Sequence, residues 1–502
     1  MPGTTPGPVH GSEHYDLVII GGGPAGEKGA AQAAYFGKRV CLIERAPKPG
    51  GAAINTGTIP SKTLRETALY FSGLRQRGLY GVDYQVKHDI TIADFMFRER
   101  AVVSSEWSLI EENLRRHHVT TYQGAARFLS PVEVEIARFN QPPRHVTGEI
   151  FLIATGSQPV RPADVPFDGA IVVDSDSLLR LSRIPNTMIV VGGGIIGCEY
   201  ACIFAALGVR VTLLNSRERL LTQLDAELSE ALRARMTGRL GIKVITDAEV
   251  TSVQVHDNLG HVTLTDGTEL GAEVVLYSTG REGCTGDLAL DIANIDVNRR
   301  GYIVVDEKFR TSAPGVYAVG DVVGFPALAS TSMEQARVAM CHAFDLKYKQ
   351  RVSPVLPYGV WTIPEIAMVG ETEESARGKD LSFETGRASY RLNARGQITG
   401  DTEGFIKLIF RTEDQRLLGA SIIGEGACEL IHVAMACMAY EGTIDFFIQS
   451  VFNYPTYAEA YKYAAYDGLQ RLARRITNGK GLPAIVPSDS NGRPAAVIEP
   501  SH

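Results

Sequence analysis

Two Gly-x-Gly-x-x-Gly motifs are the strongest chemical signals in the chain, one at residues 21–26 and the other at residues 192–197. Each stands between an apolar stretch and a stretch of small residues, which predicts a strand, a tight turn and a helix. In such a turn the backbone can approach a pyrophosphate, and the helix N-terminus faces its negative charge. One motif alone is weak evidence. Two copies with matched spacing predict two dinucleotide sites rather than two packing units that bind nothing.

Acidic and polar side chains occur where a dinucleotide fold would use them. Glu44 and Asn215 each follow the first glycine of their motif by 23 residues, where a side chain can bind a ribose. A further predicted strand, at residues 315–324, ends by presenting Asp321. Its carboxylate could accept hydrogen bonds from the ribityl hydroxyls of a flavin, although a simple turn aspartate is the alternative. Two dinucleotides in one chain indicate a flavin and a nicotinamide that exchange electrons.

Composition places the chain among ordinary globular proteins. Its 502 residues are 44% apolar and 21% charged, and the net charge is −7, which excludes a disordered chain and disfavours binding to nucleic acid or an anionic membrane. No apolar run is long enough for a transmembrane helix, and the start of the chain does not resemble a signal peptide. Seven cysteines without a Cys-x-x-Cys pair predict a reduced, cytoplasmic protein without a metal site. Cys198 and Cys202 are interpreted as small packing residues.

Five segments give the chain a resemblance to a known family. They are GTIPSKTLRE at residues 57–66, GCEYACIF at 197–204, LLNSRERLL at 213–221, WTIPEIAMVG at 361–370 and FNYPTYAEAY at 452–461. With the glycine motifs, they resemble the two-dinucleotide flavoprotein reductases, the family of dihydrolipoamide dehydrogenase and glutathione reductase. Within that family the resemblance is to the soluble pyridine nucleotide transhydrogenases. It implies an α/β fold with two Rossmann-like dinucleotide-binding domains and a C-terminal α+β dimerisation domain.

The resemblance also implies how the chain is divided. An FAD-binding domain is expected at residues 15–160 and 295–350, an NAD(P)-binding domain at 161–294, and a dimerisation domain at 351–475. Residues 1–14 and 476–502, which are rich in Pro and Gly and lack periodicity, are expected to be disordered tails. FAD is the expected bound cofactor, NAD and NADP are the expected substrates, and a homodimer or larger homo-oligomer is the expected assembly.

Lys62 and Glu199 are, by family position, a catalytic pair beside flavin N5. Residues expected to contact FAD or a nicotinamide nucleotide are Gly21, Gly23, Pro24, Ala25, Gly26, Glu44, Arg45, Gly51, Thr56, Gly57, Lys62, Gly124, Ala125, Ala154, Thr155, Gly156, Gly192, Gly194, Ile195, Ile196, Gly197, Glu199, Asn215, Ser216, Arg217, Thr279, Gly280, Arg281, Gly320, Asp321, Leu328, Ala329 and Ser330.

Two departures from the family pattern bear on the chemistry. The family carries its redox disulfide in Gly-Gly-x-Cys-x-x-x-x-Cys-x-Pro-Ser-Lys, and this chain has Ala53 and Thr58 at the two cysteine positions. Neither side chain can form a thiolate, so disulfide exchange by this route is excluded. Tyr454 stands where the disulfide reductases have a histidine base, while their glutamate is retained as Glu459. Because tyrosine is a poor proton acceptor at neutral pH, we interpret Tyr454 as an interface aromatic.

Without thiols, a flavin is the only two-electron store that remains. The resemblance and the lost groups together predict hydride transfer between NADPH and NAD+, in a ping-pong cycle through flavin N5. Asn215 removes the charge that would repel an NADP 2′-phosphate, and Arg217 could bind that phosphate, unless the two are a turn residue and a solvated charge. Alternatives are an NAD(P)H diaphorase or quinone reductase on the same fold and, from another class, an FAD-binding scaffold without turnover.

The loss of both thiols predicts that the reduced protein holds two electrons per subunit. Anaerobic titration with dithionite should therefore stop at one two-electron equivalent per flavin, without a thiolate-to-flavin charge-transfer band. Activity with NADPH and NAD+ should also survive thiol alkylation. A Cys198→Ala control is needed because Cys198 precedes Glu199. A four-electron endpoint would reveal a hidden redox cysteine and contradict the prediction.

Overall fold

The computed structural model describes residues 13–73 and 90–478, with side chains as far as Arg475. The chain forms two compact units, the first ending at Ile366 and the second beginning at Ala367. The sequence placed the start of the C-terminal domain at residue 351. Both glycine motifs therefore belong to the first unit.

The first glycine motif lies at the end of a strand of the first sheet. Its spatial order is β3 (Thr120–Gln123), β2 (Val40–Glu44), β1 (Glu13–Ile20), β6 (Gln141–Ile153), β5 (Glu133–Arg138) and β4 (Ala125–Ser130), and β17 (Val316–Ala318) also pairs with β6. Strands β3, β2, β1, β6 and β17 are mutually parallel, whereas β5 and β4 run antiparallel to their neighbours. The parallel strands thus present their carboxyl ends at one edge.

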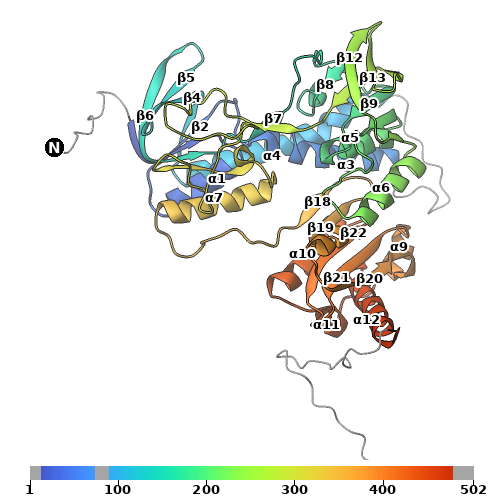
Figure 1. Ribbon diagram of the computed structural model, residues 1–502. Coiled ribbons are helices and arrows are strands. Elements are labelled where there is room, and N and C mark those ends of the chain that lie inside the picture. Colours follow the sequence, from blue (N-terminus) through green and yellow to red (C-terminus); the bar gives the residue numbers. More distant parts are fainter. Residues whose placement is uncertain (1–12, 74–89, 479–502) are drawn as a thin grey trace, which may run out of the picture. The chain divides into compact units, whose positions relative to one another are not determined.

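Both faces of this sheet are buried. On one face, α1 (Pro24–Tyr35) and α7 (Ala329–Ala343) lie side by side (Figure 1). Along β1, Leu17 and Ile19 belong to the core beneath these helices, whereas Val18 and Ile20 belong to the core of the opposite face. Burial on both sides explains why residues 17–20 of β1 are an unbroken apolar run instead of an alternating one.

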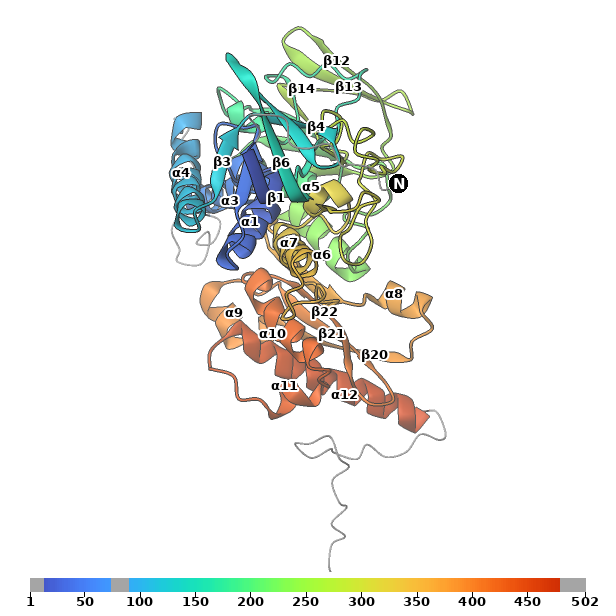
Figure 2. The ribbon, with the colours of Figure 1, turned by 90° about the vertical axis from the view of Figure 1, so that its left-hand side faces the viewer.

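Three helices follow β2 in the chain. They are α2 (Gly51–Asn55), α3 (Thr58–Ser72) and α4 (Ile92–Arg116), and α4 packs along α3 (Figure 2). A capping box starts α4, because Thr91 and Asp94 each accept a hydrogen bond from the other's backbone N–H. His117 caps the C-terminal end of this helix.

The second sheet repeats the plan around the second motif. Its strands are all parallel, in the order β11 (Lys243–Ile245), β10 (Arg210–Leu214), β9 (Thr187–Val191), β15 (Val274–Tyr277) and β8 (Val172–Val173). The accompanying helices are α5 (Ile195–Ala206) and α6 (Ala226–Gly238). An antiparallel layer of β12 (Val250–His256), β13 (Leu259–Leu264) and β14 (Glu269–Ala272) packs on it through a shared apolar core. Strands β7 (Ser157–Pro159) and β16 (Arg281–Gly283) form a short antiparallel pair.

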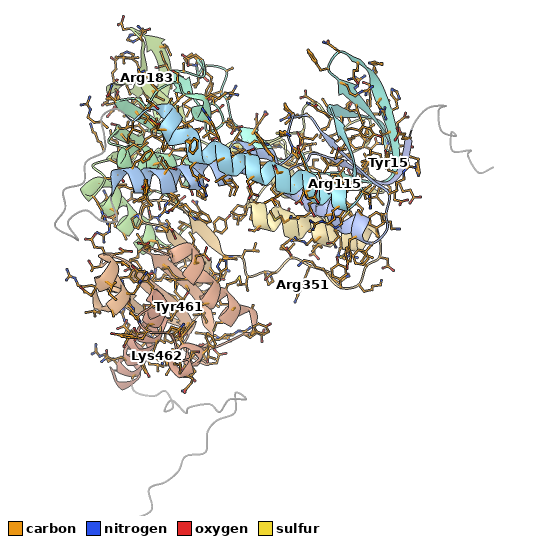
Figure 3. The ribbon with its side chains drawn as sticks, turned by 180° about the vertical axis from the view of Figure 1, so that it is seen from behind. Tyr15, Arg115, Arg183, Arg351, Tyr461 and Lys462 are labelled. Carbon is orange, nitrogen blue, oxygen red and sulfur yellow. The ribbon has the colours of Figure 1, made fainter. Side chains whose placement is uncertain are left out.

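The second unit is built on a sheet in which β20, β21 and β22 are antiparallel. Its strands follow the order β19 (Ile366–Gly370), β22 (Leu417–Ile423), β21 (Phe405–Arg411) and β20 (Phe383–Ser389). Its helices are α8 (Glu373–Gly378), α9 (Ala394–Thr399), α10 (Ala427–Ala439), α11 (Asp445–Gln449) and α12 (Ala460–Asn478). Tyr461, labelled in Figure 3, is fully buried and its hydroxyl donates to the carbonyl of Leu430, which ties α12 to α10.

The described structure includes the inner end of each predicted tail. Strand β1 begins at Glu13 because residues 13 and 14 pair with β6, and the Glu13 carboxylate accepts hydrogen bonds from Tyr15 and Tyr122 at 2.7 Å each. Helix α12 continues to Asn478 and so includes residues 476–478, which were expected to belong to the C-terminal tail. The predictions for residues 1–12 and 479–502 lie outside the described residues. In the described part of the chain, no helix combines the length and apolarity that crossing a membrane requires.

The two glycine turns have the same geometry. Gly21 and Gly192 have φ of +105° and +111°, a backbone conformation that favours glycine. A Cβ on Gly26 would overlap the carbonyl oxygen of Gly21, and a Cβ on Gly197 would overlap that of Gly192. The third glycine of each motif therefore lets the helix press directly on the end of its strand.

This close contact predicts that Gly26→Ala and Gly197→Ala destabilise the protein by about 1–3 kcal/mol or more, the usual cost of overpacking. Thermal unfolding should show a clear loss for both variants. Gly238→Ala, at the end of α6 with no atom within 4 Å of the added Cβ, is the control and should melt like the parent. Equal melting temperatures for all three variants would contradict the account of the turn.

Candidate active site between the two dinucleotide folds

The predicted cofactor residues around the first sheet follow the carboxyl ends of its parallel strands. They lie in the turn and first residues of α1 (Gly21, Gly23, Pro24, Ala25, Gly26), after or at the end of β2 (Glu44, Arg45), from α2 into α3 (Gly51, Thr56, Gly57, Lys62), between β3 and β4 (Gly124, Ala125), after β6 (Ala154, Thr155, Gly156) and from the 3₁₀ turn η2 (Gly320–Val323) into α7 (Gly320, Asp321, Leu328, Ala329, Ser330). Because parallel strands end at one edge, segments far apart in sequence converge there.

The second sheet gathers its own set in the same way. Gly192, Gly194, Ile195, Ile196, Gly197 and Glu199 lie in the turn and α5, Asn215, Ser216 and Arg217 follow β10, and Thr279, Gly280 and Arg281 follow β15. The turn is held to its own sheet by a hydrogen bond from the Gly192 N–H to Leu214 O at 2.8 Å. The first turn has the equivalent bond, from the Gly21 N–H to Ile43 O, also at 2.8 Å.

Glu44 is fixed by backbone donors on both sides. Its Oε2 accepts from the N–H of Gly22 at 2.6 Å, and its Oε1 accepts from the N–H of Ala46 at 2.7 Å. The carboxylate therefore lies against the middle of the first glycine turn. In this position it can still accept a hydrogen bond from a ribose hydroxyl, because each carboxylate oxygen has further acceptor capacity.

The edge of the first sheet fits a flavin dinucleotide. Gly23 and Gly51 approach so closely that a Cβ on Gly51 would lie 2.8 Å from the Cα of Gly23, which leaves only backbone at the point where a pyrophosphate would bind. The Thr155 hydroxyl is buried and has no hydrogen-bond partner among the described residues. A buried polar atom of this kind is costly unless a ligand or water satisfies it.

Asn215 occupies the position in the second fold that Glu44 occupies in the first. Its side chain donates hydrogen bonds, whereas that of Glu44 accepts them. It is buried, and its Nδ2 donates to the carbonyl oxygens of Arg217 at 2.6 Å and Arg219 at 3.1 Å. The amide group therefore holds its own turn, where Glu44 instead accepts from backbone N–H groups. A carboxylate at position 215 could not make these two donations.

The region around Asn215 leaves space and positive charge. A Cβ on Gly194 would meet no atom within 4 Å, so the start of α5 is open. Arg217 is exposed, and its Nη1 donates to the Thr222 hydroxyl at 2.7 Å. An open helix N-terminus beside an exposed guanidinium can hold phosphate groups. These residues fit a nicotinamide dinucleotide and do not exclude its 2′-phosphate.

Lys62 and Glu199 join the two dinucleotide folds. Lys62 Nζ, from α3, lies 2.6 Å and 2.9 Å from the two carboxylate oxygens of Glu199 on α5. The Glu199 side chain is only 5% exposed, whereas that of Lys62 is 24% exposed. Leaving one of these charges buried without the other would be strongly unfavourable, so each requires its partner. The pair that the resemblance implies is present, and it reaches solvent from the lysine side.

The two positions where the family has its disulfide lie shortly before Lys62 in sequence. Ala53 is on α2, and Thr58 is the first residue of α3, which also carries Lys62. All seven cysteines are free. Burial raises the pKa of Cys198 well above its usual value, that of Cys202 to about 12 and that of Cys437 to about 11. These thiols are kept protonated, so they cannot replace a redox pair at neutral pH.

Tyr454 belongs to the second unit and is 73% exposed. Its neighbour Glu459 accepts a hydrogen bond from Tyr463 at 3.4 Å, and the charge of Glu459 is the main cause that raises the pKa of Tyr463. Glu459 is therefore engaged with Tyr463 within its own unit.

Sequence reasoning missed Ser157, which links Asp321 to Arg281. Its hydroxyl donates to Asp321 Oδ2 at 2.8 Å and accepts from Arg281 Nε at 2.9 Å, while Arg281 Nη2 donates to its carbonyl at 2.7 Å. A sequence signal was present, because Ser157 directly follows Ala154, Thr155 and Gly156, which were expected to contact a cofactor. Its two contacts had no such signal, because the partners lie more than a hundred residues away in sequence.

Two further residues were missed beside the site. Burial raises the pKa of Asp176, which is hydrogen-bonded to Thr56 and lies 3.8 Å from Arg281 Nη1. Trp361 donates its backbone N–H to Glu199 Oε1 at 2.9 Å. No local pattern marks either residue, since each is defined by contacts between distant segments. Within residues 13–73 and 90–478, no group of three or more His, Cys, Asp or Glu side chains is arranged to hold a metal ion.

Comparisons with known proteins agree with this architecture. Residues 15–343 match the family described as pyridine nucleotide-disulphide oxidoreductase, and residues 356–465 match the dimerisation domain of the same family. The chain therefore belongs to the pyridine nucleotide-disulphide oxidoreductases, which are FAD-dependent enzymes with Rossmann-type sheets.

Named relatives span almost the whole chain. The soluble pyridine nucleotide transhydrogenase of Mycobacterium tuberculosis is 44% identical over 459 residues, covering 91% of this chain and 98% of the relative. That of Colwellia psychrerythraea is 38% identical over 461 residues, with 91% and 98% covered. Among solved structures, LpdA from Mycobacterium tuberculosis has a TM-score of 0.83 at 27% identity and covers 90% of this chain and 99% of its own. The flavoprotein disulfide reductase RclA from Escherichia coli has a TM-score of 0.80 at 28% identity, with the same coverage.

The exposed guanidinium of Arg217 predicts a selective effect on phosphorylated nucleotides. Arg217→Ala should weaken NADPH binding by about 1–3 kcal/mol, or roughly 5- to 150-fold in Kd, the usual worth of a charge-assisted hydrogen bond. NADH binding should change little. Equilibrium titration with each nucleotide measures both. Arg210→Ala, at the other end of strand β10, is the control and should affect neither. An equal loss for NADPH and NADH would contradict the assignment.

Proposed function

We propose that the protein catalyses hydride transfer between NADPH and NAD+, with FAD as its bound cofactor. The observation that carries the proposal is a paired Lys62 and Glu199 in a two-dinucleotide flavoprotein fold whose disulfide positions hold Ala53 and Thr58. An enzyme of this family that lacks the redox pair of cysteines does not have the family's route to a disulfide substrate. The names of its relatives, which span over nine-tenths of the chain, support the same activity.

The residues that would hold FAD lie at the edge of the first sheet. Gly23 and Gly51 leave room for the pyrophosphate, Glu44 accepts from the ribose, and Thr155 gains the hydrogen-bond partner that it lacks. Asp321 can accept from a sugar-alcohol chain, since Ser157 already orients its carboxylate. FAD supplies a group that accepts and returns two electrons as a hydride, which no side chain of this protein can do.

The second fold would bind the two nicotinamide nucleotides in turn. The open start of α5 at Gly194 receives the pyrophosphate, and Asn215 keeps the ribose position free of negative charge. Arg217 binds the 2′-phosphate when NADPH is present and remains solvated when NAD+ is present. A single site that accepts both nucleotides fits a ping-pong order, in which NADP+ leaves before NAD+ enters.

Lys62 and Glu199 would order the region where the two folds meet. The Lys62 ammonium is held in place by a buried carboxylate, so that positive charge is fixed there before the nucleotide binds. Preorganised charge stabilises a developing negative charge without the cost of reorienting water. Glu199 in turn accepts the N–H of Trp361 and so is fixed from a second side.

The same proposal includes the domain assignment and the assembly. Residues 15–160 and 295–350 bind FAD, residues 161–294 bind NAD(P), and residues 351–475 form the dimerisation domain. The match of residues 356–465 to a dimerisation domain supports a homodimer or a larger homo-oligomer built from dimers. Free, buried cysteines support a reducing, cytoplasmic compartment.

A stopped-flow experiment tests the reaction in two halves. Anaerobic mixing with NADPH should bleach the flavin absorbance, and later mixing with NAD+ should restore it faster than a quinone does. Lys62→Met should slow the bleaching at least about tenfold, since each lost charge-assisted interaction is worth about 1.4 kcal/mol or more. Thr58→Ala is the matched control on the same helix and should leave both rates unchanged. Faster reoxidation by quinone than by NAD+ would instead indicate a diaphorase, and a colourless protein would remove the proposal.

A further inference from the structure

Trp361 contacts both members of the Lys62–Glu199 pair. Its backbone N–H donates to Glu199 Oε1 at 2.9 Å, and the Lys62 ammonium lies over its ring, 4.9 Å from the centroid. Glu199 Oε1 is also one of the two oxygens that Lys62 contacts. The three residues come from α3, α5 and the segment after β18 (Tyr358–Val360), and all belong to the first unit.

The segment that carries Trp361 is itself fixed to α3. Arg65, one turn after Lys62, is almost fully buried, and its Nε donates to the carbonyl of Thr362 at 2.9 Å. The Arg65 guanidinium also lies 3.3 Å from Glu365. The Thr362 hydroxyl donates to the carbonyl of Pro364 at 2.7 Å, which closes the turn after Trp361. The indole therefore stands on a backbone held by two helices, as a positioning group requires.

We infer that Trp361 is a positioning residue that holds the Lys62 ammonium in its pair with Glu199. A lysine has a flexible four-carbon stem and many rotamers, so a carboxylate alone leaves its ammonium several ways to pair. The ring supplies a second attraction from another direction and keeps water from that side of the ammonium. The inference rests on the proposed function for the role of the pair, but the contact itself is independent of it.

Two substitutions separate the ring from the backbone. Every variant retains the backbone N–H of residue 361, which donates to Glu199. The substitutions therefore test only the ring. Trp361→Leu should lower kcat for NADPH–NAD+ turnover about five- to thirtyfold with little change in KM, because Lys62 is misplaced after the nucleotides have bound. Trp361→Phe keeps an aromatic face and should recover most of that loss.

Phe344→Leu is the matched control. The Lys38 ammonium lies 4.9 Å from the Phe344 ring centroid, the same distance as in the Lys62 contact, but at the far end of α7. This variant removes an equivalent cation–π contact and should leave kcat unchanged. Loss of activity that is equal in Trp361→Leu and Trp361→Phe would mean that only the bulk of the indole matters, and would overturn the inference.

A fluorescence measurement tests the contact without turnover. The chain has two tryptophans, and the other, Trp107, donates its Nε1–H to Asn55. In a Trp107→Phe background of the holoenzyme, Trp361 is the only indole, so its emission reports its own surroundings. Lys62→Met should change the intensity or position of that emission, whereas Lys38→Met should not. If the emission of Lys62→Met, like that of Lys38→Met, equals that of the parent, the Lys62 ammonium does not occupy the ring face. That result would overturn the inference.

A failure of the proposed function can be distinguished from a failure of the positioning role of Trp361. If the parent protein does not couple NADPH to NAD+ but Lys62→Met alters the emission of Trp361, the proposed function fails and the contact stands. If the parent is active but Trp361→Leu keeps the full kcat, the proposed function stands and the positioning role of Trp361 is wrong.

Discussion

The third glycine of each motif sets the distance between strand and helix, and the remainder of each dinucleotide fold depends on it. A side chain at Gly26 or Gly197 would overlap the carbonyl oxygen at the start of its own turn. Without that side chain, α1 and α5 begin directly at the ends of β1 and β9. The helix N-terminus is thereby brought to the same edge as the strand ends that carry Glu44, Asn215 and Asp321. An added methyl group would move the helix away from the strand ends that carry these three residues.

On that common frame, one position has opposite hydrogen-bonding polarity in the two folds. Glu44 accepts from two backbone N–H groups, whereas Asn215 donates to two carbonyl groups. Both arrangements stabilise the turn that contains them, so the backbone can be nearly the same while the charge differs. The first fold presents a fixed negative charge to its ligand, and the second presents none, with Arg217 exposed nearby. The two folds therefore share a frame and differ in charge at this position.

The ion pair between Lys62 and Glu199 is the link between the folds. The two residues are 137 positions apart, and a nearly buried carboxylate would be unfavourable without its partner. Trp361 and Arg65 extend the link by fixing the residues 361–365 to both helices. The absence of cysteine at Ala53 and Thr58 leaves this link intact, since neither residue takes part in it. The Lys62–Glu199 link is thus present in a chain that has no cysteine at residues 53 and 58.

The sequence by itself determined the class of fold and much of the chemistry. Glycine spacing and apolar periodicity are local properties, and the close approach of strand and helix in a βαβ unit depends on them alone. The absence of thiols at Ala53 and Thr58 is likewise a fact of composition, which no fold can change. Tertiary structure decided what required contacts between distant segments. One example is the hydrogen bonding of Ser157 to both Arg281 and Asp321. Others are the buried Thr155 hydroxyl that has no partner among the described residues, and the donation of the Asn215 amide to its own turn. Tertiary structure also decided that Glu13 belongs to β1, since this residue pairs with β6. Trp361 illustrates the physical reason most clearly: a ring face and a backbone N–H acquire a role only when two other segments bring a cation and a carboxylate to them.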